Sequence, residues 1–163
     1  MDENLIITKE TTCSFTGHRP AKLHTSEAEV KAALEREIDS AIASGYRTFI
    51  TGMSTGVDLW AGEIVLHRMQ GDKTINIIAA LPYSTFGSRM AKEWKTIFDD
   101  IMNKAIFTKI ISPQYHIGVY QARDKWMVDN SSRVIAVFNG EPGGTKFTIE
   151  YAERTGVEVI RAV

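Results

Sequence analysis

The sequence predicts an α/β fold in which a doubly wound, mostly parallel sheet carries helices on both faces. Short apolar runs alternate with amphipathic stretches along the whole chain, which is typical of βαβ units. No internal repeat or low-complexity linker interrupts this alternation. The 163 residues, 44% of them hydrophobic, suffice for one well-buried core. We therefore expect residues 1–163 to form a single domain, with residues 1–9 as a short arm that is either ordered or flexible.

Six apolar runs predict the strands of this sheet. They lie near residues 11–16, 47–51, 75–80, 105–110, 133–138 and 157–161. After the first run, apolar residues recur every four positions, and Ser26 followed by Glu29 forms a capping box. A later helix shows large apolar residues at helical spacing and has Ser84 or Thr85 as its cap. Its apolar residues are Met90, Trp94, Ile97, Phe98, Ile101 and Met102.

Composition and charge narrow the classes of protein. With Lys+Arg 19 against Asp+Glu 20, the net charge of −1 creates no overall field for nucleic acid or an anionic membrane. The start of the chain lacks a signal-peptide pattern, and no apolar run approaches the ~20 residues of a membrane span. We therefore expect a cytoplasmic protein with no membrane partner.

Cysteine and histidine give no sign of a disulfide or a metal centre. The chain has a single cysteine, Cys13, which lies in an apolar run and is expected to be a buried, inert thiol. The four histidines, His18, His24, His67 and His116, are scattered without metal-ligand spacing. We expect no metal and no cofactor.

The first two strand-to-helix loops are unusual, and in such a sheet ligands bind at the carboxyl ends of the strands, where the strand order reverses. In "SFTGHRP", Gly17 can bring backbone close to a ligand and Arg19 can add a cation, or the segment is a tight turn with a solvated arginine. In "ITGMSTGVDLWAGE", two glycines flank a Ser54–Thr55 cap. Asp58 then lies in the first helical turn, as a partner of the helix dipole or as an acceptor for a ribose hydroxyl.

The helix "YQARDKWMVDNSS" carries an arginine on its apolar face. Tyr120, Arg123 and Met127 share that face, so the guanidinium interrupts an apolar stripe and requires an anion. The anion is either a ligand or a structural partner among the neighbours of Asp124 or at Glu150.

The segment "AVFNGEPGGTKFTIEYAERTG" exposes its backbone directly after an apolar run. Gly143, Gly144 and Thr145 precede a helix that carries Glu150. Glycines at a helix start allow backbone N–H groups to approach a phosphate, and the alternative is a simple left-handed turn.

These motifs, in this order, resemble the SLOG superfamily, a Rossmann-like group that includes the SMF/DprA and Lonely Guy proteins. "FTGHRP", "FITGMSTGVDLWAGE" and "ARDKWMVDNSSRVIAVFNGEPGGTKFTIEYA" carry the resemblance, which spans Cys13 to Ile160 and is strongest for the small stand-alone YpsA-like branch. It implies a Rossmann-like fold and a pocket for a nucleotide derivative. The ligand-binding residues that we then predict are Gly17, His18, Arg19, Gly52, Ser54, Gly56, Asp58, Pro82, Tyr120, Arg123, Gly143, Gly144 and Thr145.

Two classes of function follow from the resemblance. In the first, the protein senses or sequesters an ADP-ribose- or NAD-derived molecule, or another signalling nucleotide, without turnover. In the second, it is a Lonely Guy-like N-glycoside hydrolase of a nucleoside monophosphate or NAD-like substrate. Arg123 then holds the phosphate or orients the ribose, and the Glu150 carboxylate stabilises an oxocarbenium-like centre or activates water.

Departures from the Lonely Guy motifs favour binding. The chain keeps Arg123 and Met127 of "RKxxM", and it keeps the spacing from the glycine pair to Glu150 in "PGGxGTxxE". However, Asp124 replaces the lysine, and Lys146 and Phe147 replace the Gly-Thr pair. Fewer preorganised donors then remain than hydrolysis needs.

We expect a nucleotide-derived small molecule as the partner and a homo-oligomer, a dimer or larger, as the assembly. DNA binding, as in the SMF/DprA relatives, is not expected, because the chain is near neutral and lacks a basic stripe.

Overall fold

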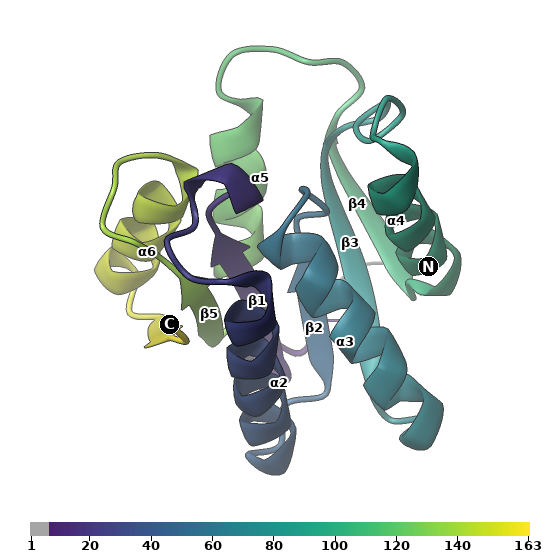
Figure 1. Ribbon diagram of the computed structural model, residues 1–163, viewed down its shortest axis with the longest axis vertical. Coiled ribbons are helices and arrows are strands. Elements are labelled where there is room, and N and C mark those ends of the chain that lie inside the picture. The colour runs from purple at the N-terminus through teal and green to yellow at the C-terminus, as the bar shows by residue number, and fades with distance from the viewer. Residues whose placement is uncertain (1–6) are drawn as a thin grey trace.

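The computed structural model describes residues 7–163, whose strands form one parallel six-stranded sheet of order β4-β3-β2-β1-β5-β6 (Figure 1). The strands are β1 Thr12–Gly17, β2 Thr48–Thr51, β3 Asn76–Tyr83, β4 Phe107–Ser112, β5 Arg133–Val137 and β6 Glu158–Arg161. Every neighbouring pair is parallel. The six predicted strands are confirmed, and β3 continues to Tyr83, beyond its predicted end at residue 80.

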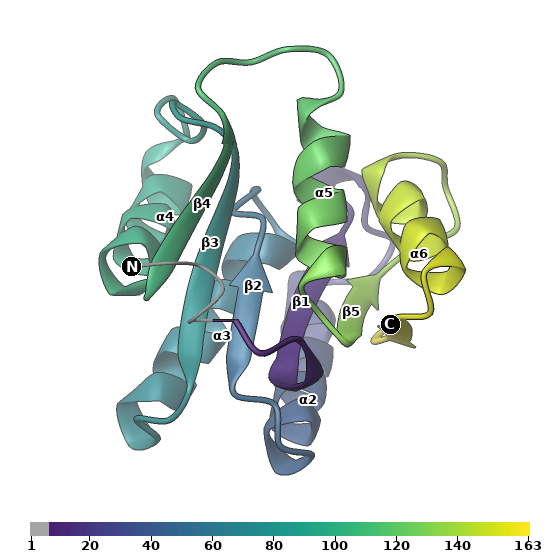
Figure 2. The same ribbon diagram turned by 180° about the vertical axis from the view of Figure 1, so that it is seen from behind.

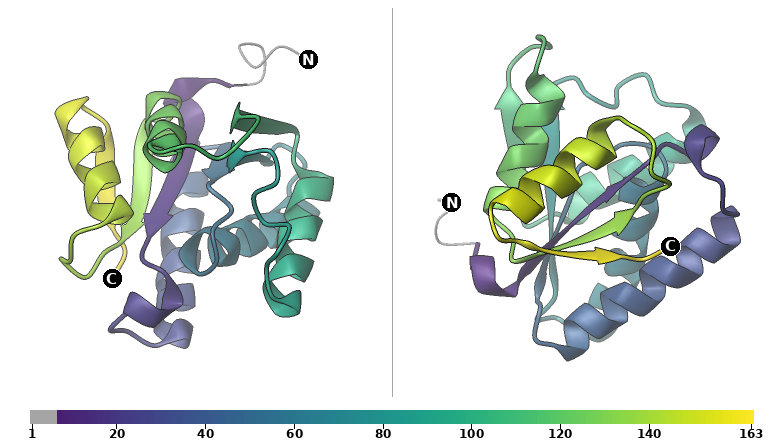
Figure 3. Two further views of the ribbon diagram at one scale, coloured as in Figure 1. Left: turned by 90° about the horizontal axis from the view of Figure 1, so that it is seen from above. Right: turned by 90° about the vertical axis from the view of Figure 1, so that its left-hand side faces the viewer.

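Within residues 7–163, five α-helices cover the two faces of the sheet, which confirms the doubly wound architecture. They are α2 Glu27–Ala43, α3 Val57–Gly71, α4 Lys92–Lys104, α5 Val119–Asp129 and α6 Gly144–Arg154. Helices α2, α3 and α4 lie on one face, and α5 and α6 lie on the other (Figures 1 and 2). The view from above in Figure 3 separates the same two layers. After β4 the chain crosses back through α5 and places β5 on the other side of β1, so the direction of winding reverses between β1 and β5.

The central strands β1, β2, β3 and β5 are buried on both faces, which explains why they appear as continuous apolar runs, while the edge strands β4 and β6 are partly exposed. In β3, Ile77, Ala79 and Leu81 belong to the large core beneath α2, α3 and α4. The alternate residues Ile78 and Ala80 belong to a smaller core beneath α5.

One predicted helix cap is confirmed and another is wrong. The Ser26 hydroxyl accepts a hydrogen bond from the Glu29 N–H at 3.2 Å, as the capping box predicts. Helix α4, in contrast, begins at Lys92 rather than after Ser84 or Thr85. Residues 84–89 form turns around Gly87, whose φ of +91° cannot continue a helix, and the Ser84 hydroxyl instead donates to the Pro113 carbonyl at 2.6 Å.

The predicted arm at residues 1–9 is described only in part, because residues 1–6 lie outside the described residues. Ile7 packs against the smaller core, and a 3₁₀ turn spans Lys9–Thr11. Of the helices within residues 7–163, none combines the length and the apolar character that crossing a membrane requires. Cys13 is fully buried in β1, and burial raises the pKa of its thiol.

Candidate functional site

A cavity of about 440 Å³ lies at the carboxyl edge of the sheet, where the winding reverses. We call it the main cavity. It is lined by the loops that follow β1, β2 and β5 and by one side of α5, as expected for the switch point of a doubly wound sheet. Its lining residues are Phe15, Thr16, Gly17, His18, Arg19, Lys22, Ser54, Thr55, Asp58, Tyr120, Gln121, Arg123, Asp124, Met127, Gly143, Gly144 and Thr145.

Gly17 at the end of β1 is required for packing. A Cβ at this position would lie 2.4 Å from Cγ2 of Val57, the first residue of α3. Glycine therefore lets α3 approach β1 closely, a role that differs from the direct ligand contact considered for it from the sequence.

The residue after Gly17 brings a buried imidazole to the main cavity. His18 is 5% exposed and stacks on Phe138 with ring centroids 5.4 Å apart. Its Nε2 is the single buried side-chain nitrogen or oxygen within residues 7–163 that lacks a hydrogen-bond partner. Burial, helped by nearby Lys22, lowers the pKa of His18, so the ring is neutral at pH 7.

The loop after β2 is built around an aspartate. The Asp58 carboxylate accepts a hydrogen bond from the Ser54 N–H at 3.3 Å, and the Thr51 hydroxyl donates to the Asp58 carbonyl at 2.8 Å. The residue that caps α3 is Gly56, with φ +93°, so the prediction of a Ser54–Thr55 cap is wrong. Instead, the Asp58 side chain in the first turn of α3 accepts a hydrogen bond from the Ser54 N–H in the loop that precedes the helix.

Arg123 is buried beside this aspartate and has partners within the protein. Its Nη1 donates to the Gly52 carbonyl at 2.7 Å, and its Nε donates to the Asp124 carboxylate at 3.0 Å. A Cβ at Gly52 would lie 2.8 Å from the Asp58 carboxylate and 3.2 Å from Cζ of Arg123. Of the two alternatives for Arg123, the ion pair is therefore present, and its partner is Asp124 itself.

Burial raises the pKa of both carboxyl groups around Arg123. The pKa of Asp58 rises from 3.8 to about 6, mainly by desolvation, with the Arg123 charge opposing the rise and Asp124 adding to it. Desolvation also raises the pKa of Asp124, against the charge and hydrogen bond of Arg123. One guanidinium thus lies between two carboxyl groups that hold their protons more tightly than they do in the unfolded chain.

This arrangement predicts a pH-dependent stability that involves Asp58. Because the folded state binds the proton more tightly, the contribution of Asp58 to stability is full below pH 3.8 and is lost as the pH rises through about 6. The expected loss is up to about 3 kcal/mol. Urea unfolding of the wild type and Asp58→Asn at about pH 4 and about pH 7 checks it, since asparagine does not titrate. The free energy of unfolding of the variant, minus that of the wild type, should therefore be larger at about pH 7 than at about pH 4. Parallel pH profiles would contradict the prediction.

The fourth wall of the main cavity is the start of α6. Gly143 has φ +144° and caps the helix, and Gly144 and Thr145 form its first turn. The N–H groups of a first turn have no partners within the helix. A Cβ at Gly144 would meet a single heavy atom within 4 Å, Oδ2 of Asp124 at 3.9 Å, so this side of the turn is open.

Not all of the residues predicted from the sequence lie at the main cavity. Gly52 and Gly56 are absent from its lining, where Gly52 makes room for Asp58 and Arg123, and Gly56 packs against Pro20. Pro82 is buried within β3 and does not line the cavity. The remaining predicted ligand-binding residues do line it, and they are Gly17, His18, Arg19, Ser54, Asp58, Tyr120, Arg123, Gly143, Gly144 and Thr145.

Glu150, the catalytic carboxylate of the hydrolase alternative, is exposed and does not line the main cavity. The inner side of α6 is formed by Thr145, Thr148, Ile149 and Ala152. Glu150 lies five residues after Thr145, a separation of about 140° around a helix, so it points away from the inner side.

Sequence reasoning missed several cavity residues, among them Lys22, Gln121 and Asp124. For Asp124 a signal existed, since it follows Tyr120 by four positions and therefore lies on the same side of α5. Lys22 and Arg19 are both exposed, and neither forms an ion pair with any residue of the described part of the chain. Between residues 7 and 163, no group of three or more His, Cys, Asp or Glu side chains could hold a metal ion.

Comparisons with known proteins relate this chain to one family and one fold. The model of the YspA SLOG family matches residues 13–158. The UPF0398 protein OB1025 of Oceanobacillus iheyensis is 24% identical over 149 residues, covering 86% of this chain and 80% of the relative. The UPF0398 protein BH1768 of Halalkalibacterium halodurans is also 24% identical, covering 86% of this chain and 79% of the relative.

Two solved structures of DNA processing protein A share the fold. The Streptococcus pneumoniae protein has a TM-score of 0.66 and 19% identity, covering 95% of this chain and 50% of the other. The Helicobacter pylori protein has a TM-score of 0.66 and 15% identity, covering 96% of this chain and 66% of the other. This chain thus spans about half to two thirds of these larger proteins.

The expectation that nucleic acid is not a partner is wrong. The H. pylori protein, which shares this fold, has a single-stranded DNA binding mode. A net charge near zero averages over the whole surface and does not exclude local contacts, and Arg19 and Lys22 are such local cations.

Proposed function

This chain belongs to the YspA SLOG family, and we propose that its main cavity binds a phosphorylated, nucleotide-derived small molecule, such as an ADP-ribose or NAD derivative, and senses or sequesters it without turnover. The observation that carries the proposal is the buried Nε2 of His18, which has no partner. A buried polar atom without a hydrogen bond costs free energy, and a ligand in the adjoining cavity can supply that bond. The neutral imidazole can donate or accept at Nε2, depending on its tautomer.

The charges around the main cavity suit a phosphate. Arg19 and Lys22 are exposed in its lining and have no ion-pair partner within residues 7–163. The first turn of α6 adds backbone N–H groups and the positive end of the helix dipole. A phosphate between these groups would form charge-assisted hydrogen bonds.

The position of Glu150 supports binding over hydrolysis. The hydrolase alternative requires a free carboxylate beside the scissile bond. Glu150 lies outside the main cavity, and the carboxylates within it, Asp58 and Asp124, already interact with Ser54 and Arg123. Asp58, with a pKa of about 6, is the group through which a hydrolase could still transfer a proton.

Calorimetry with ADP-ribose tests the binding proposal. His18→Phe keeps a ring that can stack on Phe138 but removes Nε2, so its affinity should fall roughly tenfold through loss of one hydrogen bond. Glu150→Gln is the matched control and should bind as the wild type does, because Glu150 is exposed. Equal affinity of His18→Phe and the wild type would count against the site.

Turnover is tested by incubating wild-type protein with NAD⁺ and with AMP, followed by chromatography. We expect both compounds to be recovered intact. Release of free nicotinamide or adenine that Asp58→Asn abolishes, while ADP-ribose binding is kept, would replace the binding proposal with the hydrolase.

Single-stranded DNA is a second candidate ligand of the main cavity. The shared fold with the H. pylori protein and the exposed Arg19 and Lys22 favour it. Titration of a fluorescent oligothymidylate at two salt concentrations gives the comparison, because neutralised phosphates make DNA binding strongly salt-dependent. Salt-sensitive binding that Arg19→Ala weakens, with no binding of ADP-ribose, would make DNA the ligand.

A further inference from the structure

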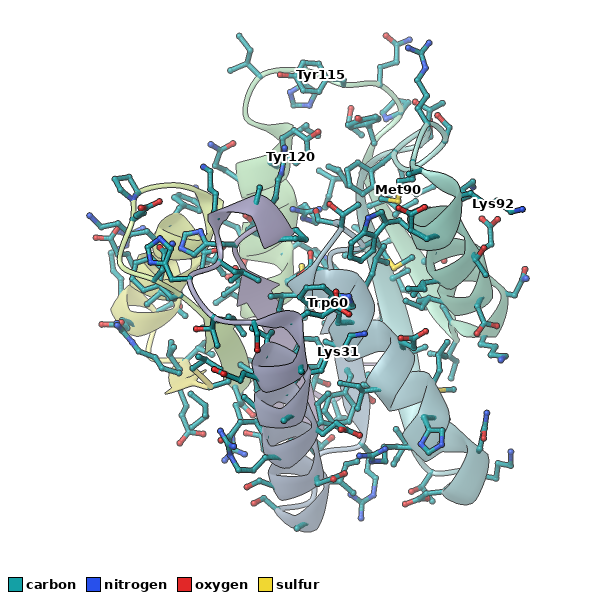
Figure 4. The ribbon with its side chains drawn as sticks, viewed as in Figure 1. Lys31, Trp60, Met90, Lys92, Tyr115 and Tyr120 are labelled. Carbon is teal, nitrogen blue, oxygen red and sulfur yellow. The ribbon has the colours of Figure 1, made fainter. Side chains whose placement is uncertain are left out.

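A second cavity, of about 570 Å³, lies at the same edge of the sheet and is not part of the site described above. It is lined by the end of β3 and the turns that follow, from Tyr83 to Met90. Its lining includes Phe86 and the exposed Arg89. In Figure 4, Met90 lies on the α4 side of this edge, and Tyr115 and Tyr120 lie on the α5 side.

Four aromatic rings gather at this edge, where side chains from the linings of the two cavities are in contact. Tyr83 ends β3, Phe86 lies in the turns after it, Tyr115 lies in the loop before α5, and Tyr120 lies in the first turn of α5. The Tyr83 ring lies 5.6 Å from Phe86, 5.8 Å from Tyr115 and 6.3 Å from Tyr120, in each case edge to face. We call these four residues the aromatic cluster.

The aromatic cluster contributes rings to the linings of both cavities. Tyr120 lines the main cavity, and its ring lies 6.3 Å from that of Phe86, which lines the second cavity. The Arg123 guanidinium lies over both rings, 5.7 Å from Tyr120 and 6.0 Å from Phe86. A ligand that contacts Tyr120 in the main cavity would therefore lie one ring contact away from a residue that lines the second cavity.

One member of the aromatic cluster remains open to solvent. Tyr115 is 59% exposed, and Ile117 in the same loop is 92% exposed. Tyrosine and phenylalanine rings provide flat apolar faces on which a nucleobase can stack, and every base has such a face. The cations of the main cavity and the rings of the second thus suit the two chemical parts of one nucleotide, its phosphate and its base.

We propose that the aromatic cluster is the stacking site for the nucleobase of the ligand whose phosphate occupies the main cavity. This inference rests on the proposed function. The ligand then extends from the start of α6, past Tyr120, to the second cavity, where Arg89 adds a further cation at its exposed rim. Two cavities of this size, with lining rings in contact, suit a ligand longer than a mononucleotide, such as an ADP-ribose-like molecule.

Calorimetry with two probes, ADP-ribose and ribose 5-phosphate, tests the assignment, because only the first carries a base. Tyr115→Leu removes an exposed ring without touching the core, and Tyr115→Trp retains an aromatic face. Ile117→Ala is the matched control in the same loop. We expect Tyr115→Leu to weaken ADP-ribose binding roughly tenfold, with ribose 5-phosphate unchanged and with Tyr115→Trp and Ile117→Ala close to the wild type.

The possible outcomes separate this inference from the proposed function. If both probes bind and Tyr115→Leu leaves ADP-ribose affinity unchanged, or weakens both probes equally, the stacking site is wrong and the phosphate site stands. If ribose 5-phosphate binds and ADP-ribose does not, the stacking site is also wrong. If neither probe binds wild-type protein, both proposals fail. If Tyr115→Leu weakens an oligothymidylate but not ADP-ribose, the rings stack on DNA bases and the small-molecule assignment is overturned.

Discussion

Arg123→Ala should lower the free energy of unfolding by about 3–5 kcal/mol near neutral pH, the largest stability effect that we expect from a single change in the main cavity. Arg123 is 6% exposed, and the change leaves the buried Asp58 and Asp124 carboxyl groups without a cation. It also removes the donor to the Gly52 carbonyl. The loss should be smaller at about pH 5, where these two carboxyl groups hold their protons for a larger fraction of the time.

Urea unfolding at both pH values measures this effect. Arg161→Ala is the matched control, because Arg161 and its partner Glu153 are both 58% exposed and such surface pairs contribute about 1 kcal/mol or less. If the two variants lost similar stability, or if the Arg123→Ala loss did not change with pH, the buried pair would not have the structural role that its geometry indicates.

Gly144→Val should lower the affinity for ADP-ribose at least ~100-fold while leaving the unfolding midpoint close to that of the wild type. Gly144 has no positive φ, and the space around its missing side chain is open. Valine therefore fits the backbone, but its side chain occupies the position from which a phosphate would reach the first turn of α6.

The matched control is Gly71→Val, the same change at an exposed position at the far end of α3. Calorimetry and thermal unfolding of both variants give the comparison. If Gly144→Val bound ADP-ribose as tightly as the wild type does, the glycine turn would have only a conformational role and would not contact the phosphate.

The fold was predictable because its signals are local. The central strands β1, β2, β3 and β5 are buried on both faces, so they appear in the sequence as continuous apolar runs. Ser26 with Glu29 marks a helix start within four residues. The Ser84 and Thr85 caps failed for a related reason. Hydroxyl residues favour turns as well as caps, and Gly87 makes this segment a series of turns.

The candidate site was predictable in position but not in its internal contacts. Carboxyl-end loops must gather at one edge of a parallel sheet, so the loops themselves could be named. The pairing of Arg123 with Asp124 could not be, because adjacent helical residues do not normally face each other. Asp58 and Arg123 come from helices on opposite faces of the sheet and approach each other beside Gly52 at its carboxyl edge, an arrangement that no local pattern encodes.

A glycine in the sequence also does not reveal which neighbour requires it. Gly17 and Gly144 both line the main cavity, yet a Cβ would collide with Val57 at the first and would enter nearly open space at the second. The two residues differ only in what the folded chain places beside them.

Because Cys13 is buried, the reaction of its thiol with a reagent reports transient opening of the protein core. Cys13 is the only cysteine in the chain, and its side chain is fully buried in the core between β1 and the helices that cover it, so a thiol reagent can reach it only when this core opens. The rate of alkylation of Cys13 therefore measures how often the protein opens, as hydrogen exchange does for buried amides. A molecule that binds the folded state and not the open one slows that rate, so mass spectrometry can screen unlabelled compounds before the natural ligand is identified.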